Sequence, residues 1–315
     1  MRSLAMILFS LVVALTLMTA CTTTPASTPT PTPGPITITD DLNRTVTVAE
    51  IPQRIVSLSP SNTEILFALD LGDKVVGVTD FCDYPEELLA KIDAGEIQRV
   101  GTTFPGFNLE TIVDLEPDVA FAIGATVPEY VTDLEGLGIP VIILQPEDID
   151  GIFSDIELVG EVTGKEAEAE TLIADLAELI DEIVAKVADA PLPRVFYGTD
   201  VSNPNTLYTV GSGTFIDALI TLAGGENITG GLEGWTTYNL EDLVYSNPNI
   251  VVIGGANWGV SAEEVASRLV WQDLDAVKNG KIFAIDDTPL VRPGPRIADG
   301  LELLAGLIHP ELFKD

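Results

Sequence analysis

Residues on which most catalytic and metal sites depend are scarce in this sequence of 315 residues. It contains one histidine, His309, and two cysteines, Cys21 and Cys82. One histidine excludes metal sites built from several imidazoles and leaves His309 alone for a histidine-dependent triad, while two cysteines exclude a disulfide framework. The GxSxG, Walker and GxGxxG motifs are absent as well. We therefore expect a protein that is not an enzyme and that holds no cofactor.

Basic side chains are also few, since 15 Lys and Arg stand against 49 Asp and Glu and give a formal net charge of -34. Such an acidic surface repels nucleic acid and anionic lipid headgroups, so we expect neither as a partner. The acidic residues are dispersed through sequence that is 46% hydrophobic, which is typical of folded domains rather than of a disordered acidic tail. The length allows two domains of ordinary size.

The N-terminal segment predicts where the protein resides. After Arg2, residues 4–18 are almost wholly apolar, a length typical of a signal-peptide core and too short for a comfortable membrane span. We predict a signal peptide over residues 1–20. Residues 17–21 (LMTAC) resemble a lipoprotein box, in which cleavage precedes the cysteine and its sulfur receives a lipid. Cys21 is therefore the predicted lipidation site, with an unlipidated secreted protein or an N-terminal anchor helix as the alternative.

Residues 21–35 interleave proline with threonine, a composition that excludes helix and sheet and favours an extended spacer. No second apolar run of comparable length follows. We expect the rest of the chain to fold outside the cytoplasm, anchored to the cell membrane through its N-terminal lipid only.

The remaining sequence alternates strand-like and helix-like segments. Runs such as 119–123 and 250–253 are apolar and β-branched, which is typical of buried parallel strands, and helical periods separate them. Residues 165–190 break this alternation, because apolar residues recur there at helical spacing over several turns. We predict an α/β fold of two Rossmann-like lobes with parallel sheets, residues 36–164 and 191–315, bridged by a single long helix at 165–190.

Two segments of the chain are similar to each other. Asn108-Leu109-Glu110 and Asn239-Leu240-Glu241 each begin a predicted short helix that ends at Pro and Asp or Asn before a strand. An Asn cap and an early Glu both suit a helix N-terminus. We interpret the pair as equivalent positions in two similar lobes.

Motifs spread along the chain resemble those of one protein family. They are RIVSLSPSNTEIL at 54–66, VGVTD at 76–80, CDYP at 82–85, GGEN at 224–227 and PRI at 295–297, together with the two Asn-Leu-Glu segments. The pattern is similar to that of the helical-backbone (class III) periplasmic substrate-binding proteins of ABC importers for vitamin B12, iron-siderophores and haem. It covers about residues 40–313, and its Asp-Tyr-Pro segment looks most like the cobalamin-binding branch. The resemblance implies two Rossmann-like lobes with a ligand held between them.

The resemblance implies ligand contacts in two segments that follow strands. It places Asp83 and Tyr84 at the corrin, with a surface turn as the alternative for Tyr84. It also places an acid near the end of the strand at 281–285, where Asp286 and Asp287 both occur. We favour Asp287 as the acceptor of hydrogen bonds from corrin amides.

Aromatic residues elsewhere complete the predicted ligand site. The cobalamin-binding pattern has a Trp in the loop where this sequence has Phe104 and Phe107, so both are predicted contacts, with core packing as the alternative. Tyr208 is expected in a polar loop where the family carries an aromatic residue. Trp235, in a glycine-rich loop, has little local core to join, so we expect it to face the ligand. Trp258, at the carboxyl end of a predicted strand, is a second candidate for the cleft.

The resemblance also implies partners. In the family, one Glu on each lobe docks on arginines of the permease, and Glu110 and Glu241 occupy those positions; exposed acids that merely favour a helix start are the alternative. We expect a monomer that captures a corrinoid and delivers it to an ABC permease dimer with its ATPase. A ferric-siderophore or haem binder is one alternative, although few basic residues are available for a polyanionic siderophore. A cell-surface enzyme or sensor on the same fold is the alternative of another class.

Overall fold

The computed structural model describes residues 34–103, 106–124, 126, 128–203 and 206–314. These residues belong to one compact unit, Pro33–Asp315. The predicted signal peptide, Cys21, most of the predicted spacer and Phe104 lie outside the described residues. Within the part of the chain that is described, no helix combines the length and the apolar character needed to cross a bilayer.

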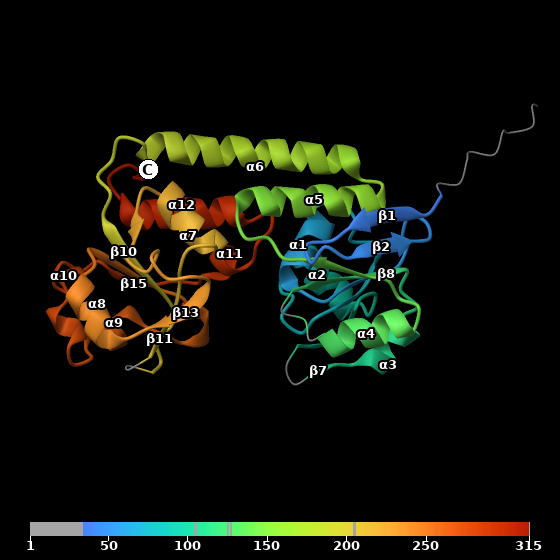
Figure 1. The fold of residues 1–315 in the computed structure, drawn as a ribbon, viewed down its shortest axis with the longest axis horizontal. Coiled ribbons are helices and arrows are strands. Elements are labelled where there is room, and N and C mark those ends of the chain that lie inside the picture. The colour runs from blue at the N-terminus through green and yellow to red at the C-terminus, as the bar shows by residue number, and fades with distance from the viewer. Residues whose placement is uncertain (1–33, 104–105, 125, 127, 204–205, 315) are drawn as a thin grey trace, which may run out of the picture. The chain divides into compact units, whose positions relative to one another are not determined.

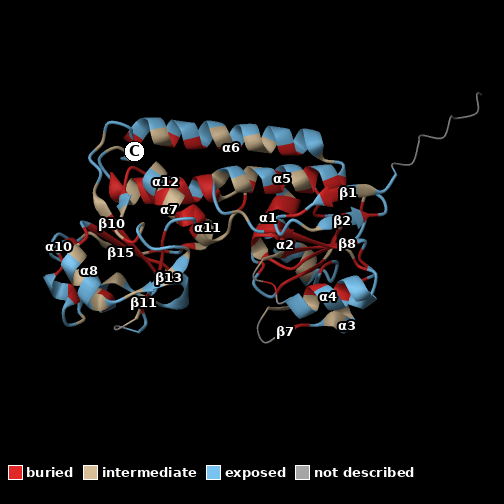
Figure 2. Cartoon of the chain, viewed as in Figure 1, coloured by how far each residue is buried: buried red, intermediate tan, exposed pale blue. Residues whose placement is uncertain are grey.

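The first lobe is built around a parallel sheet (Figure 1). Its elements are β1 (Ile36–Thr39), β2 (Thr45–Val48), β3 (Ile55–Ser57), α1 (Pro60–Ala68), β4 (Val75–Val78), α2 (Glu86–Asp93), β5 (Gln98–Arg99), β6 (Gly101–Thr102), β7 (Gly106–Phe107), α3 (Leu109–Asp114), β8 (Val119–Ile123), α4 (Pro128–Gly136), β9 (Val141–Leu144) and α5 (Ile149–Thr163). The sheet order is β5-β4-β3-β8-β9, and all neighbouring strands are parallel. β3, β8 and β9 are buried almost throughout, which explains their apolar and β-branched sequences (Figure 2). The chain leaves β3 towards β4 and returns on the other side of β3 at β8, so the topological switch point lies between β3 and β8.

The second lobe is built around a mixed sheet. Its elements are β10 (Arg194–Asp200), β11 (Leu207–Val210), α7 (Phe215–Leu222), β12 (Glu226–Asn227), β13 (Trp235–Tyr238), α8 (Leu240–Ser246), β14 (Ile250–Ile253), η1 (Ala256–Trp258), α9 (Ala262–Ala266), η2 (Trp271–Asp273), α10 (Asp275–Lys278), β15 (Ile282–Ala284), α11 (Thr288–Val291) and α12 (Ile297–Ile308). The order is β13-β11-β10-β14-β15, with β12 beside β10. β10 is parallel to β12 and β14, and β14 to β15, but β11 is antiparallel to both of its neighbours. The main sheet of each lobe is thus parallel as expected, except for β11 of the second lobe, and the first lobe also carries two antiparallel two-stranded sheets, β1-β2 and β6-β7.

Tyr208 and Trp235 lie on strands rather than in the predicted loops. Tyr208 belongs to β11, where it pairs with Thr237, and Trp235 begins β13 opposite Val210. β13 is at the edge of the sheet, and its residues alternate between exposed and half-buried. Its sequence, which follows a glycine-rich stretch, therefore resembles a loop, because an edge strand need not be apolar on both faces.

A long helix, α6 (Glu166–Val187), links the two lobes (Figure 1). It packs against α5 of the first lobe and α12 of the second. Leu176, Ile180, Ile183 and Val187 are buried at spacings of three and four residues, while the outer face of the helix is exposed and largely acidic (Figure 2). The α/β fold of two lobes joined by one long helix is confirmed.

Candidate functional site

A cavity of about 600 Å³ lies at the carboxyl ends of the strands that flank the switch point of the first sheet. Its first-lobe wall consists of residues directly after or at the ends of β3, β8 and β9, namely 59–61, 123–124 and 144–146. The second lobe closes it with Phe215, Trp235 and residues 291–293. Open parallel sheets bind ligands at this place, and the volume falls in the range of small-molecule sites.

Two smaller cavities adjoin the first and share walls with it. One, of about 440 Å³, shares Ser59 and Pro60 and extends to Phe81. The other, of about 430 Å³, also contacts Pro60 and Phe81 and extends to Trp258 of the second lobe. We call the three adjoining cavities the inter-lobe cleft.

Aromatic side chains from both lobes shape the cleft. Trp235 meets Phe215 edge to face, with ring centroids 6.0 Å apart. Trp258 of the second lobe meets Phe81 of the first in the same manner at 6.5 Å, and both rings remain more than half exposed. Much of their apolar surface is therefore available to a ligand, because edge-to-face contacts leave ring faces uncovered.

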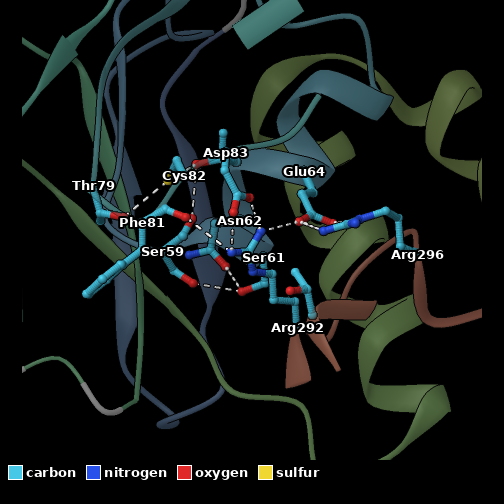
Figure 3. A network of polar contacts seen from close by, with 12 residues as sticks. Ser59, Ser61, Asn62, Glu64, Thr79, Phe81, Cys82, Asp83, Arg292 and Arg296 are labelled. Carbon is cyan, nitrogen blue, oxygen red and sulfur yellow. Dashed lines mark hydrogen bonds and ion pairs between the residues drawn. The ribbon is translucent and has the colours of Figure 1, made fainter. Parts of the chain in front are cut away.

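A network of charged groups crosses the cleft beside these cavities (Figure 3). Glu64 of α1, whose side chain is 1% exposed, accepts two hydrogen bonds from Arg296, at 2.6 and 2.8 Å, and one of 3.1 Å from Arg292. The Glu64 carboxylate raises the pKa of Arg296 above its ordinary value. Burial lowers the pKa of Arg292, but its bonds to Asp83 and Glu64 outweigh burial and leave that pKa raised. Both arginines therefore stay charged and bind one buried carboxylate from the opposite lobe.

Asp83 and Tyr84 are engaged by the same network. Asp83 lines the third cavity, and its carboxylate is 2.5 Å from the Arg292 guanidinium. The ring of Tyr84 lies 4.2 Å from the guanidinium of Arg296, a cation–π contact. Tyr84 is half exposed but is not among the described residues that line the cleft. The ligand contacts predicted for this pair stay predictions.

Asp287 lines the cleft, yet both of its oxygens are already bonded within the protein. They accept hydrogen bonds from the Tyr197 hydroxyl at 2.8 Å and from the Gly255 backbone N–H at 3.1 Å. Burial, and next the Asp287 carboxylate, raise the pKa of Tyr197, so Tyr197 remains a donor. The neighbouring Asp286 is exposed, and its hydrogen bonds from Thr288 lower its pKa. Asp287 therefore organises the end of β14, and any ligand contact must use its remaining lone pairs.

Of the other predicted ligand residues that the structure describes, two line the cleft and two do not. Trp235 and Trp258 line the cleft. Phe107 is buried against Tyr130, with ring centroids 5.2 Å apart, which agrees with the core-packing alternative. Tyr208 is half exposed on β11 and is not among the described lining residues.

Several polar residues that line the cleft were not among the predicted ligand residues. In the main cavity they are Gln145, Arg292, and Ser59 and Ser61 of the segment after β3. The available signal was their position, since Gln145 and Ser59 each follow directly after a short run rich in apolar, β-branched residues, 141–144 and 55–58. Arg292 had no such signal, because it reaches the site from the start of a loop after α11.

The two Asn-Leu-Glu segments adopt equivalent structures. The Asn108 side chain accepts a hydrogen bond of 3.1 Å from the Thr111 N–H at the start of α3. The Asn239 side chain accepts one of 2.8 Å from the Asp242 N–H at the start of α8. Glu110 and Glu241 both lie exposed in the first turns of these helices. The predicted Asn caps are confirmed, and docking stays a prediction.

Comparison with known proteins places these features in a family. Residues 55–289 match the family described as periplasmic binding protein. An uncharacterised ABC transporter substrate-binding lipoprotein of Bacillus subtilis is 32% identical over 288 residues, which cover 89% of this chain and 88% of that protein. A cobalamin-binding protein of Halobacterium salinarum is 29% identical over 284 residues, which cover 87% of this chain and 74% of its own.

Two solved structures share the fold, with similar TM-scores and sequence identities. The periplasmic vitamin B12-binding protein of Vibrio cholerae has a TM-score of 0.69 and 26% identity, covering 84% of this chain and 99% of its own. The periplasmic haem-binding protein of a Roseiflexus species has a TM-score of 0.71 and 25% identity, covering 82% of this chain and 99% of its own. The similar structures thus include binders of two different metal-containing macrocycles.

Proposed function

This chain belongs to the periplasmic binding protein family, and from that membership we propose that it is the extracytoplasmic substrate-binding lipoprotein of an ABC importer for a corrinoid. The chemical lining of the inter-lobe cleft is the observation that carries this proposal. The cleft combines aromatic faces of Phe81, Trp235 and Trp258 with neutral polar groups such as Ser61 and Gln145. A corrin is a broad ring with amides at its rim, so ring contacts and neutral hydrogen-bonding groups suit it.

The charge balance of the cleft disfavours a polyanionic ferric siderophore. Arg292 is the cationic side chain among the described residues that line it. Its guanidinium is already bonded to Glu64 and Asp83, and Asp80 and Asp287 add further acids to the wall. A polyanion needs uncommitted arginines or lysines, which this surface does not offer.

The same lining disfavours haem as the cargo. Haem iron in proteins is held by His, Cys, Met or Tyr. None of these four residue types occurs among the described residues of the cleft wall. His309 is 2% exposed and bonded through its ring to the Gly224 carbonyl at 3.0 Å, which agrees with a structural role. A corrinoid such as cyanocobalamin fits better, because its cobalt already carries axial ligands of its own and needs none from the protein.

The remaining parts of the proposal concern delivery. The lipid on Cys21 holds the protein at the outer face of the membrane. The exposed carboxylates of Glu110 and Glu241, one on each lobe, meet arginines of the permease, and twin sites suit a two-fold symmetric partner. The relatives are transport proteins, which supports capture and release without chemistry on the ligand.

Calorimetric titration of the mature protein with cyanocobalamin, haemin and a ferric tri-catecholate siderophore tests the ligand. We expect saturable binding of cyanocobalamin at micromolar concentration or below, and none of the siderophore. Binding of haemin or the siderophore without cyanocobalamin binding would refute the corrinoid assignment and leave the family intact.

A further inference from the structure

The main cavity contains a side-chain amide for which the fold leaves a dedicated space. Gln145 directly follows β9, is exposed and lines the cavity of about 600 Å³. Its backbone N–H donates to the Asp41 carboxylate. Its side-chain amide has no hydrogen-bond partner among the described residues of the chain. An amide in a ligand-sized cavity with all its donors and acceptors unused is equipped to bind a solute.

Gly124, at the end of the neighbouring strand β8, provides the space. A Cβ atom at this position would lie 1.3 Å from the Gln145 Oε1 and 2.3 Å from its Cδ. Gly124 is not among the glycines with positive φ, so the backbone itself does not require glycine there. The missing side chain instead allows the Gln145 amide to lie over the end of β8, at the wall nearest the switch point.

The β1–β2 turn fixes the backbone from which this amide extends. The Asp41 N–H donates to the Ile143 carbonyl at 3.2 Å, and the Asp41 carboxylate accepts from the Gln145 N–H two residues further on. The neighbouring Asp40 carboxylate accepts from the Ile143 N–H at 3.2 Å and from Arg44. With its main chain held at several points, Gln145 presents its amide from a defined position.

We propose that Gln145 is a specificity-determining residue, which pairs its amide with an amide at the rim of the bound ligand. This inference rests on the proposed function. A glutamine offers both a donor and an acceptor, so it forms two reciprocal hydrogen bonds with a primary amide. A ligand carboxylate in place of this amide accepts one of these hydrogen bonds but cannot donate the other. It is also repelled by the negative charges of Asp80, Asp83 and Asp287 in the adjoining wall. The pair thus favours amide-bearing over acid-bearing ligands.

Calorimetry with cyanocobalamin on four variants tests the geometry. Gln145→Ala removes the amide, and Gly124→Ala displaces it at little cost to the fold, because the clashing atoms are at the flexible end of a side chain. We expect each change to weaken binding about tenfold, the effect of losing one or two hydrogen bonds. The double variant should be no weaker than the weaker single one, because both remove the same contact. Gly136→Ala is the control, since nothing lies within 4 Å of a Cβ there.

A second titration distinguishes recognition of a rim amide by Gln145 from a general effect of the shape of the side chain. Cyanocobalamin and its monocarboxylic acid derivatives, in which one rim amide is hydrolysed, are compared on the wild type and on Gln145→Glu. In Gln145→Glu, the affinity for one of the acids relative to that for cyanocobalamin should fall about tenfold or more below its wild-type value. The reason is that a ligand carboxylate then faces the carboxylate of the variant. A ratio unchanged for every acid, or single variants that bind cyanocobalamin as the wild type does, would overturn the inference. If the wild type itself fails to bind cyanocobalamin, the proposed function falls instead.

Discussion

Glu64 and Arg292 are 228 residues apart in sequence, yet the carboxylate of one accepts a hydrogen bond of 3.1 Å from the guanidinium of the other across the inter-lobe cleft. Arg296 binds the same carboxylate through two nitrogens. The Glu64 side chain is almost completely buried, so these cations are what make its charge tolerable there. The contact links α1 of the first lobe to the segment before α12 of the second.

Removing the Glu64 charge should destabilise the protein more than an ordinary surface change. In Glu64→Gln, two partly buried arginines lose their shared counter-charge, and loss of one partner from a buried pair costs about 3–5 kcal/mol. Urea unfolding followed by far-UV circular dichroism measures the free energy of unfolding. The exposed Glu170→Gln on α6 is the control and should stay within about 0.5 kcal/mol of the wild type. Equal stabilities for the two variants would show that the cross-lobe contact is not formed in solution.

A buried acid in α5 should make stability depend on pH. Burial, and next the neighbouring carboxylate of Asp41, raise the pKa of Asp155 to about 9, and one of its oxygens has no hydrogen-bond partner among the described residues. An unfolded Asp titrates near pH 3.9. Between these values the folded state holds a proton that the unfolded state has released, so stability contributed by this group falls as pH rises, by up to about 1.4 kcal/mol per pH unit.

Asp155→Asn tests this linkage because it removes the titration and keeps the shape. The free energy of unfolding of the variant should increase relative to the wild type at each step from pH 5 to pH 8. Asp175→Asn, an exposed change on α6, should follow the wild type throughout. A variant whose difference from the wild type is constant over this range would contradict the raised pKa.

Reversing the charge of Glu110 or Glu241 should impair delivery of the ligand to the permease without impairing its binding. Glu110→Lys and Glu241→Lys should each reduce uptake of labelled cyanocobalamin by cells, and leave its affinity for the purified protein unchanged, because both residues lie exposed away from the cleft wall. Glu263→Lys is the matched control, since Glu263 is also an exposed acid in the first turn of a helix. Equal loss of uptake in all three variants would favour a helix-start effect over docking.

The net charge of -34 predicts that salt stabilises the fold. Screening shortens the range of repulsion between exposed acids from about 8 Å at physiological ionic strength to about 3 Å at 1 M salt. The thermal midpoint should therefore rise as sodium chloride increases over this range. Sucrose at matched osmolality controls for general solute effects and should give a smaller rise; equal rises would argue against charge screening.

Much of the fold follows from local patterns in the sequence. The bounds predicted for β8 and β14 agree with the structure, because strands buried on both faces have short apolar runs. α5 is not among the predicted helices, although Asp148 caps it and Gly164 ends it. Its glycine and β-branched residues have low helix propensity, and its formation depends on packing of its buried face.

The site is less accessible to sequence reasoning than the fold. Trp235 could be singled out because it has little local core to join, and Trp258 because it follows the carboxyl end of a predicted strand; both line the cleft. The proximity of Gln145 to Gly124 could not be predicted, because it depends on the register of β8 against β9 and on one side-chain rotamer. The bond between Glu64 and Arg292 joins separate lobes, and no local pattern encodes such a contact.

A crystal structure of the mature protein with cyanocobalamin tests the central claim most directly. The proposal predicts electron density for the corrin ring in the inter-lobe cleft, against Trp235 and with a rim amide at the Gln145 side chain. Density for the ring outside the cleft, or crystals grown at saturating cyanocobalamin in which the cleft holds only solvent, would contradict the account.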